Sequence, residues 1–366
     1  MKYFIGLLSG TSVDSIDAAL VGIGENKIQL VETHSHDFSS GLRHQLQQLI
    51  KNQSITLVEL SQIDSQLAHE FSDAVIQLLK KTQFEAKQIT AIGSHGQTIF
   101  HEPNGEYKNT IQIGSPHQIA ARCGIDVVSN FRNLDMAYKG QGAPLAPVIH
   151  QKLFHSETKN YAILNLGGIA NISFIGKNYP QPSGYDTGPA NCLLDEWILK
   201  NKGEKYDANG QWAQTGELDK NLLNQLIGDR YFNSQAPKST GREYFNLTWL
   251  SGFENSLWKC PAANVQNTLT HLSALSISNE IKKSRFPVDE VVVMGGGSKN
   301  KFLLELLGMY SQIPVHLSED FGFDGDWIES ILFAYLAYLR VNQIKLDLSA
   351  ITGSQNRILY GDLIRC

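Results

Sequence analysis

The sequence predicts an α/β protein built from two similar halves, and three observations support this class. Apolar runs of strand length alternate along the chain with segments of helical periodicity. The length of 366 residues exceeds one ordinary hydrophobic core and fits two domains. Residues 3–21 and 161–175 share one pattern, in which an apolar run breaks at small residues and resumes, as in a hairpin. This repeat indicates that the two halves are organised alike.

The first half is expected to open with an antiparallel meander and to continue with a helix and two strands. Turn-rich residues separate the first three apolar runs. The helix is predicted from apolar side chains at helical spacing, including Leu60, Ile63 and Leu67. In chain order, the expected elements are residues 3–8, 16–23, 28–33, 57–81, 89–94 and 125–129.

The glycines and the proline of residues 138–144 mark a boundary between domains. We expect residues 1–137 and about 345–366 to form the first domain, and residues 138–344 the second. Pro189 suits the first position of a helix that follows a turn at residue 185. The expected elements of the second half are a hairpin, this turn and helix, a long helix, a strand with a glycine turn, and a last helix: residues 161–175, 185–201, 265–283, 290–297 and 326–340.

Composition and charge exclude several classes of protein. The chain is 42% apolar and 18% charged, as globular proteins are, and its net charge of -5 is spread without long runs of one sign. It therefore offers no basic footprint for nucleic acid or anionic lipid. The first residues contain too few apolar side chains for a signal peptide. No apolar run approaches the length of a membrane-spanning helix. Four widely spaced cysteines favour reduced thiols. We expect a cytoplasmic protein.

Familiar nucleotide and hydrolase motifs are absent from the sequence. It contains no GxxxxGK[ST] and no GxSxG, and the glycines at residues 140–142 lack the third glycine of a dinucleotide fingerprint. A phosphate site in this chain must be of another type.

The tips of the two predicted hairpins are candidates for such a site. The small residues at 10–12 and 167–168 can bring backbone N–H and hydroxyl donors close to a phosphate. Asp14 and Asp17 follow the first tip, where at least one could hold Mg²⁺ directly or through water. The alternative is a polar turn in which Asp14 serves only local backbone groups.

A run of three glycines, Gly295, Gly296 and Gly297, follows a strand and precedes a helix that begins near Asn300. Such a turn lets a ribose or base lie against the backbone and can aim a helix N-terminus at a phosphate. A tight strand-to-helix turn without a ligand would have the same sequence.

Asp186 is a candidate base, because it is expected just before a helix. The positive potential at that end of a helix would favour an ionised carboxylate able to accept a proton. The other interpretation is that Asp186 or Thr187 only caps the helix.

Polar residues also follow two strands of the first half. His95 ends one strand, and Arg132 and Asp135 follow another, where ligands gather in open α/β sheets. His95 could instead be a structural histidine, and Arg132 with Asp135 a local ion pair. Glu329 lies in the last predicted helix and could face either a cleft or solvent.

Several segments together resemble one family, the anhydro-N-acetylmuramic acid kinases of bacterial cell-wall recycling. They follow one another in the family's order along nearly the whole chain. The matching stretches are GLLSGTSVDSID at 6–17, GSHGQTIFH at 93–101, QIG at 112–114, VVSNFRNLD at 127–135, GQGAPLAP at 140–147, NLGGIANIS at 165–173, YDTGPAN at 185–191, PKSTGRE at 237–243 and MGGG at 294–297.

The resemblance implies two actin-like (ribonuclease H-like) domains that flank an ATP cleft, as in sugar kinases and Hsp70. It implies an ATP-dependent kinase with Asp186 as catalytic base, and a homodimer as a plausible assembly. We expect Mg²⁺ to assist the transfer, with Asp14 of the first tip as its ligand. The implied sugar contacts are His95, Arg132, Asp135 and Glu329. The implied nucleotide contacts are Gly10, Thr11, Ser12, Val13, Asp14, Ser15, Ile16, Asp17, Gly167, Gly168, Gly295, Gly296 and Gly297.

Three positions depart from the family pattern. Ser15 and Lys139 stand where glycine is usual, and Ser330 stands where alanine is common. We expect Ser15 to alter nucleotide affinity without abolishing activity. Two other functions remain open at this point: a kinase of the same fold that phosphorylates an ordinary sugar hydroxyl, and a nucleotide switch similar to Hsp70 or actin.

Overall fold

The computed structural model describes residues 1–366 except 11, 26, 237, 254–256 and 258–259. The chain divides into two compact units, which we call unit 1 (Met1–Ile149 with Trp327–Cys366) and unit 2 (His150–Asp326). These bounds differ from the predicted boundaries after residues 137 and 344. Residues 327–344 belong to unit 1 because helix α13 (Ile328–Val341) packs on the strands of that unit.

Unit 1 contains a six-stranded sheet in the order β15-β7-β4-β1-β2-β3. The first three strands form the predicted antiparallel meander, whereas β4 and β7 continue parallel to β1. Two short hairpins, β5 with β6 and β13 with β14, complete its strands. The bounds are β1 Lys2–Ser9, β2 Ser15–Ile23, β3 Ile28–Asp37, β4 Ile89–Ser94, β5 Gln97–Glu102, β6 Asn109–Ile113, β7 Val127–Ser129, β13 Leu346–Asp347, β14 Arg357–Ile358 and β15 Asp362–Ile364.

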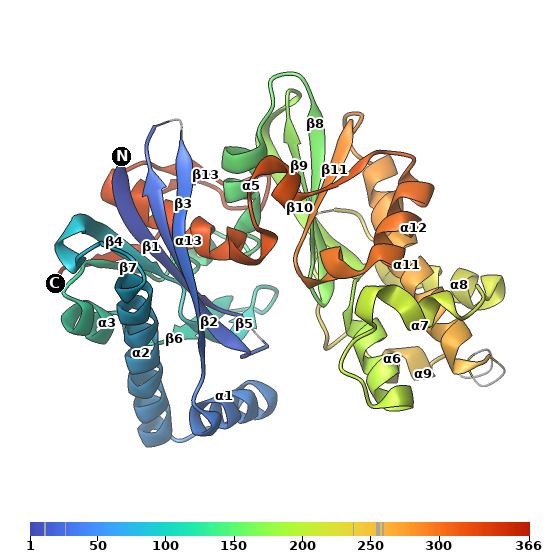
Figure 1. Ribbon diagram of the computed structural model, residues 1–366, viewed down its shortest axis with the longest axis horizontal. Coiled ribbons are helices and arrows are strands. Elements are labelled where there is room, and N and C mark those ends of the chain that lie inside the picture. The colour runs from blue at the N-terminus through green and yellow to red at the C-terminus, as the bar shows by residue number, and fades with distance from the viewer. Residues whose placement is uncertain (11, 26, 237, 254–256, 258–259) are drawn as a thin grey trace. The chain divides into compact units, whose positions relative to one another are not determined.

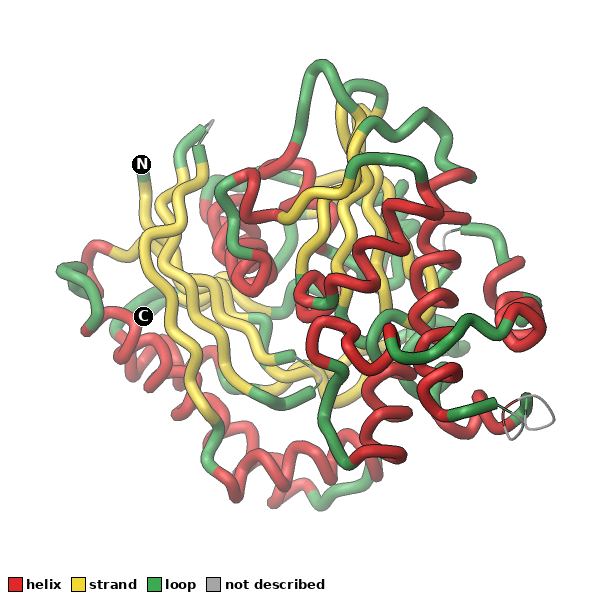
Figure 2. The backbone as a smooth tube through the Cα atoms, turned by 45° about the vertical axis from the view of Figure 1, so that its right-hand side comes forward, coloured by secondary structure: helices red, strands yellow, loops and turns green. Residues whose placement is uncertain are grey.

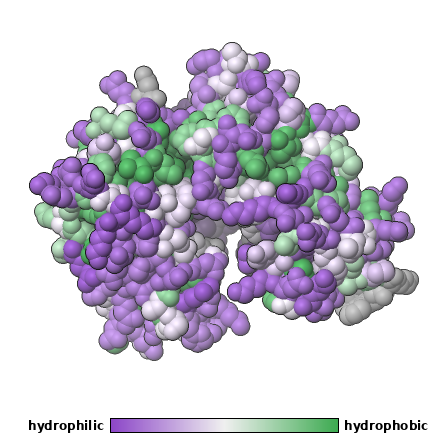
Figure 3. Space-filling model, in the orientation of Figure 1, coloured by the Kyte–Doolittle hydropathy of each residue, from purple (hydrophilic) through white to green (hydrophobic). Residues whose placement is uncertain are grey.

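Helices α1 and α2 show how the sequence sets the elements of unit 1. Thr56 and Glu59 form a capping box that begins α2, and α2 buries an apolar stripe that includes Leu67 and Phe71. The surface over these two helices is largely hydrophilic (Figure 3). The helices before unit 2 are α1 Ser40–Asn52, α2 Leu57–Lys80, α3 Pro116–Cys123, α4 Asn133–Ala137 and α5 Ala146–Phe154, the last of which crosses the boundary between units.

Two glycines let the backbone of α13 lie directly against the backbone of the sheet in unit 1. A methyl group on Gly6 of β1 would lie 1.7 Å from the carbonyl oxygen of Ser330. A methyl group on Gly93 of β4 would lie 2.0 Å from the carbonyl oxygen of Phe333. Any other residue at these two positions would therefore push the helix away from the strands.

Unit 2 repeats the strand order of unit 1, with a five-stranded sheet in the order β10-β9-β8-β11-β12. Its first three strands are antiparallel and the last two run parallel to β8. Figure 2 shows the strands of each unit as a twisted sheet accompanied by helices. The bounds are β8 Asn160–Leu166, β9 Ile169–Gly176, β10 Tyr179–Pro189, β11 Glu290–Met294, β12 Val315–Leu317, α6 Cys192–Lys202, α7 Gln211–Gln214, α8 Lys220–Ile227, α9 Leu247–Ser251, α11 Ala262–Lys282 and α12 Lys301–Ser311.

The repeated strand order is that of the actin-like (ribonuclease H-like) fold, which confirms the predicted fold class (Figure 1). The meander, both hairpins and the long helices α2 and α11 are also confirmed. Short 3₁₀ helices lie at Ala86–Gln88, Ala208–Gly210, Arg230–Asn233, Gly296–Lys299, Ser318–Phe321 and Gly325–Trp327. Within the described ranges, no helix is long and apolar enough to cross a membrane. All four cysteines are free thiols.

Candidate functional site

Asp186 lies in the edge strand of the unit 2 sheet and not in front of a helix. It belongs to β10, where it pairs with Asn171 of β9, and α6 begins only at Cys192. The predicted helix start was wrong because Pro189 ends a strand. A proline is tolerated there, since an edge strand leaves one row of N–H groups outside the ladder. The helix N-terminus therefore does not explain the charge of Asp186.

Three donors hold the carboxylate of Asp186. The side-chain amide of Asn171 donates to Oδ1. The hydroxyl of Ser239 and the backbone N–H of Thr240 donate to Oδ2 at 3.0 and 2.9 Å. Asp186 itself is only 8% exposed. This arrangement fixes the direction of the carboxylate before any ligand arrives.

Burial raises the pKa of Asp186 to about 6. The hydrogen bonds from Thr240 and Ser239 work against this rise, and the carboxylate of Glu243 adds to it. A carboxyl group with this pKa is mostly ionised at pH 7 and can still hold a proton, which suits a general base. Asp186 is therefore expected to be ionised at neutral pH, as predicted. The groups that favour its charged form are the hydrogen-bond donors Thr240 and Ser239, not a helix dipole.

The turn between β8 and β9 is tied to the start of α6. The carbonyl of Gly167 accepts from the N–H and the side-chain amide of Asn191, at 3.1 and 2.7 Å. The carbonyl of Gly168 accepts from the N–H of Cys192 at 3.0 Å. A methyl group on Gly168 would come within 2.7 Å of Nε of Arg242, so this guanidinium lies against the turn. The small-residue tip therefore carries a cation beside it.

The glycine run after β11 lies against the same part of unit 2. A methyl group on Gly295 would lie 2.3 Å from Oδ1 of Asn165, and one on Gly297 would lie 2.6 Å from Cβ of Leu166. Gly295 also has a φ of +80°. Packing thus accounts for these two glycines, whereas the space beside Gly296 is open. A ligand that approaches this turn would do so at Gly296.

The turn between β1 and β2 contains an unusual backbone conformation. Val13 has a φ of +55° although it is β-branched, and its N–H donates to the carbonyl of Gly10 at 3.1 Å. Backbone strain of this kind often occurs at ligand-binding sites. Ser12 is exposed, whereas the side chain of Ile16 is fully buried, so Ile16 can reach a ligand only through its backbone. Thr11 lies outside the described residues.

Asp14, the predicted metal ligand, forms an exposed salt bridge with Arg43 at 2.6 Å. Among the residues that the structure describes, no group of three or more His, Cys, Asp or Glu side chains could hold a metal ion. A direct bond from Asp14 to Mg²⁺ would have to replace the contact with Arg43. Its role as a metal ligand stays a prediction.

The three departures from the family pattern are accommodated locally. The Ser15 hydroxyl donates to Oδ1 of Asp17 at 3.0 Å. The Ser330 hydroxyl donates to the Asp17 carbonyl at 3.3 Å. Lys139 adopts a φ of +68°, a conformation that glycine takes more easily. Both serines therefore support the segment that begins β2.

His95 and Arg132 lie together in unit 1. The Nε of Arg132 donates to Nε2 of His95 at 2.9 Å, and Nδ1 of His95 contacts the carbonyl of Gly96 at 3.0 Å. Burial, followed by the charge of Arg132, holds the pKa of His95 well below its usual value, so the ring is neutral. Burial also lowers the pKa of Arg132 to about 10, and Glu329 opposes this. Arg132 therefore remains a cation held between a neutral ring and an acid.

Asp135 has internal partners for both carboxylate oxygens. The hydroxyls of Thr352 and Tyr360 donate to Oδ1 at 2.8 and 2.6 Å, and the N–H of Gly142 donates to Oδ2 at 2.7 Å. The side chain is fully buried, and a methyl group on Gly140 would lie 2.1 Å from Oδ2. These contacts account for Asp135 within unit 1, while its sugar contact stays a prediction.

Four polar residues around Asp186 and Gly168 were not assigned a role from the sequence. Three of them lie in the stretch PKSTGRE, which carried the family resemblance but offered no sign of its partner. The pairing of β9 with β10 brings the fourth into place. These residues are Asn171, Ser239, Thr240 and Arg242.

The chain matches one protein family over nearly its whole length. The model of the family described as "Anhydro-N-acetylmuramic acid kinase" matches residues 2–365. A protein of that name from Pasteurella multocida is 41% identical over 361 residues, which cover 98% of this chain and 96% of the relative. One from Sulfurovum sp. is 44% identical over 361 residues, which cover 98% of each chain. The chain therefore belongs to the anhydro-N-acetylmuramic acid kinase family.

Proposed function

We propose that this protein opens the ring of 1,6-anhydro-N-acetylmuramic acid with water and transfers the γ-phosphoryl group of ATP to O6. Family membership makes the chain a phosphotransferase that acts on a hydroxyl group. The observation that carries the finer proposal is the carboxylate of Asp186, which is buried, oriented by three donors and has a pKa of about 6.

In the proposed reaction, Asp186 takes a proton from water and the water oxygen bonds to C1. The C1–O6 bond breaks, O6 bonds to the γ-phosphorus, and ADP leaves. The products are N-acetylmuramic acid 6-phosphate, ADP and the proton that Asp186 later releases. Ordinary glycoside hydrolysis needs a second carboxyl group to protonate the departing oxygen. Here the phosphoryl group takes up that charge, so one carboxylate suffices.

The two small-residue turns support binding of the triphosphate. Both lie between the first and second strands of equivalent sheets. We assign phosphate contacts to Gly10 and Ser12 of one turn and to Gly167 and Gly168 of the other. Arg242, which lies against Gly168, would offset negative charge on the transferring group. ATP enters as its magnesium complex, and catalysis of phosphoryl transfer then depends mainly on positioning and electrostatics.

We assign sugar contacts to His95, Arg132 and Glu329 of unit 1. A neutral His95 and a cationic Arg132 are suited to hydroxyl and carboxylate groups of an amino sugar acid. The substrate is a fragment of bacterial cell wall, so we place the reaction in cell-wall recycling. Because the reaction consumes ATP, we place it in the cytoplasm.

The mass of the phosphorylated product tests the proposal against a simple sugar kinase. The purified chain is incubated with ATP, Mg²⁺ and the anhydro-sugar in ¹⁸O-labelled water. Ring opening gives a product that contains one added water, with label on C1. A phosphorylated product that keeps the anhydro bridge and gains no water would overturn the proposal and favour transfer to an ordinary hydroxyl. ATP hydrolysis without any sugar phosphate would favour a nucleotide switch.

A further inference from the structure

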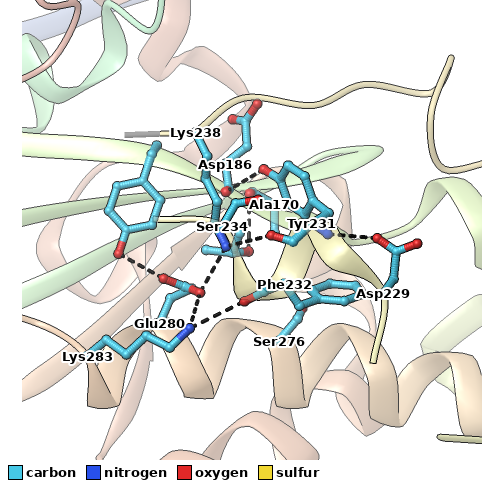
Figure 4. A network of polar contacts seen from close by, with 12 residues as sticks. Ala170, Asp186, Asp229, Tyr231, Phe232, Ser234, Lys238, Ser276, Glu280 and Lys283 are labelled. Atoms are coloured by element: carbon cyan, nitrogen blue, oxygen red, sulfur yellow. Dashed lines mark hydrogen bonds and ion pairs between the residues drawn. The ribbon is translucent and has the colours of Figure 1, made fainter. Parts of the chain in front are cut away.

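A buried ion pair is connected to Asp186 through the backbone of Lys238 and takes no part in the reaction proposed above. Nζ of Lys238 lies 3.0 Å from Oε1 of Glu280, and each side chain is 5% exposed. Removing two charges from water costs several kcal/mol per ion, so such a pair is weak evidence for stability. Because Lys238 lies beside Asp186, the pair can have a role other than stability (Figure 4).

Glu280 is the fixed end of the pair. It lies near the end of α11, a helix of 21 residues. Besides Lys238, its carboxylate accepts from the hydroxyl of Tyr185 on Oε2 at 3.1 Å and from Nζ of Lys283 on Oε1 at 3.0 Å. Figure 4 shows Lys238 and Lys283 meeting at the carboxylate of Glu280. The acid is therefore held by groups from three segments and can serve as an anchor.

Lys238 is the end of the pair that leads to Asp186. Its own carbonyl accepts from the N–H of Asp186 at 3.0 Å. The next two residues, Ser239 and Thr240, supply both donors to Oδ2 of Asp186. The segment 238–240 thus makes three of the contacts that hold Asp186, and the side chain of Lys238 ties this segment to Glu280.

Tyr231 joins the same network from a third side. Its hydroxyl donates to the carbonyl of Asp186 at 2.8 Å, and its own carbonyl accepts from Nζ of Lys238 at 3.3 Å. Nζ of Lys238 also lies 4.9 Å from the centre of the Tyr231 ring. Lys238 is therefore connected to Asp186 both through its own segment and through Tyr231.

We propose that Lys238 and Glu280 form a positioning pair, which holds segment 238–240 so that its donors keep Asp186 ionised and correctly directed. This inference rests on the proposed role of Asp186 as the base. It assigns a function in catalysis to two residues that touch neither sugar nor nucleotide.

The pH dependence of turnover separates positioning from a purely structural role. The charged and titratable groups that face Asp186 are Glu243 and Tyr231. Glu243 raises the pKa of Asp186, whereas the donors from Ser239 and Thr240 lower it. Loss of the anchor should weaken those donors, so the pKa of Asp186 should rise. Because the base must be ionised, the acid limb of the rate profile should then move to higher pH.

The test compares Lys238→Met and the double variant Lys238→Met/Glu280→Gln with the wild type. We expect Lys238→Met to lower kcat by about tenfold to a hundredfold, as misplacement of a reacting group does. We expect it to move the acid limb upward by about one pH unit, with little change in the KM for ATP. The single variant takes one of two lysines from the buried Glu280 carboxylate and should also lower Tm. In the double variant Tm should recover, while kcat and the acid limb should not.

Lys283→Met is the matched control. Lys283 donates to the same oxygen of Glu280, but its side chain is 55% exposed and it does not belong to segment 238–240. The kcat of the Lys283→Met variant and the acid limb of its rate profile should stay at wild-type values. Lys238→Arg, which keeps the charge, should restore most of kcat and guards against a misfolded Lys238→Met.

Two different results would overturn two different claims. If the double variant recovers kcat and the acid limb together with Tm, the pair is only structural and the positioning role fails, while Asp186 can remain the base. If Asp186→Asn keeps near-normal turnover, the proposed base fails and the positioning role fails with it.

Discussion

The carboxylates of Asp135 in unit 1 and Asp186 in unit 2 each accept three hydrogen bonds, but their donors come from different parts of the chain. Asp135 is fully buried, and its hydroxyl donors, Thr352 and Tyr360, lie 217 and 225 residues further along the chain. Asp186 keeps 8% exposure and takes two donors from one anchored segment. The number of donors therefore does not separate Asp186, the proposed base, from Asp135. Residual exposure and a pKa raised by burial are the features that suit Asp186 to the proposed role.

The largest expected effect is on turnover of Asp186→Asn. Asparagine keeps the shape of the side chain but cannot accept the proton, so we expect kcat to fall about a thousandfold or more. ATP binding, measured by calorimetry, should stay close to that of the wild type. Near-normal kcat would remove the distinction between the two carboxylates.

Asp135→Ala should give the opposite result, a large loss of stability with little loss of activity in the folded protein. The change leaves the Tyr360 hydroxyl and the Gly142 N–H buried without their acceptor, while the Thr352 hydroxyl keeps a bond to the Leu348 carbonyl at 3.2 Å. Each such group costs about 1–3 kcal/mol, so we expect the free energy of unfolding to fall by about 4 kcal/mol. Urea unfolding measures this change, and kcat is compared at a temperature where the variant is folded. A stable variant that has lost kcat would instead favour the sugar contact predicted for Asp135.

The pH dependence of stability should also show that the folded state disfavours the ionised form of Asp186. Its folded-state pKa of about 6 lies above the ordinary value of 3.8, so ionisation disfavours the folded state as pH rises between these values. At pH 8, Asp186→Asn should therefore unfold with a free energy about 3 kcal/mol larger than that of the wild type. Below pH 4 this gain should disappear. A pH-independent difference would show that the carboxylate carries no such strain.

The smallest effects come from removing one hydroxyl at each carboxylate. Ser239→Ala removes a donor that lowers the pKa of Asp186, so the acid limb of turnover should move upward by less than one pH unit. Thr352→Val removes a donor to Asp135 and should lower the free energy of unfolding by about 1 kcal/mol with an unchanged acid limb. Rate profiles and urea unfolding of both variants give the comparison. A shift of the acid limb in Thr352→Val would contradict it.

Much of the fold could be predicted from local patterns. The alternation of apolar residues identified both hairpins, and helical spacing identified α2 and α11 to within a few residues. The start of α6 could not be found this way. Pro189 fits the end of an edge strand as well as the first turn of a helix, and only the pairing with β9 decides between them.

The candidate site was predictable in its members but not in its contacts. Asp186 and the small-residue turns lie in recognisable stretches, whereas the partners of Asp186 come from other parts of the sequence. Lys238 and Glu280 are 42 residues apart, and lysine and glutamate usually lie at the surface. No local pattern distinguishes such a pair from two solvated side chains. The contacts of Thr352 and Tyr360 with Asp135 could not be predicted either, because they join residues separated by more than half the chain.

The close packing of α13 on Gly6 and Gly93 couples three elements mechanically. Where side chains separate a helix from a sheet, rotamer changes can absorb a small displacement. Here the helix backbone rests directly on β1 and β4, so nothing soft lies between them. A shift of Glu329 at the start of α13 must therefore carry both strands with it, and with them Ser9 and Ser94 at their ends. We therefore expect the helix and the two strands to move as one rigid body.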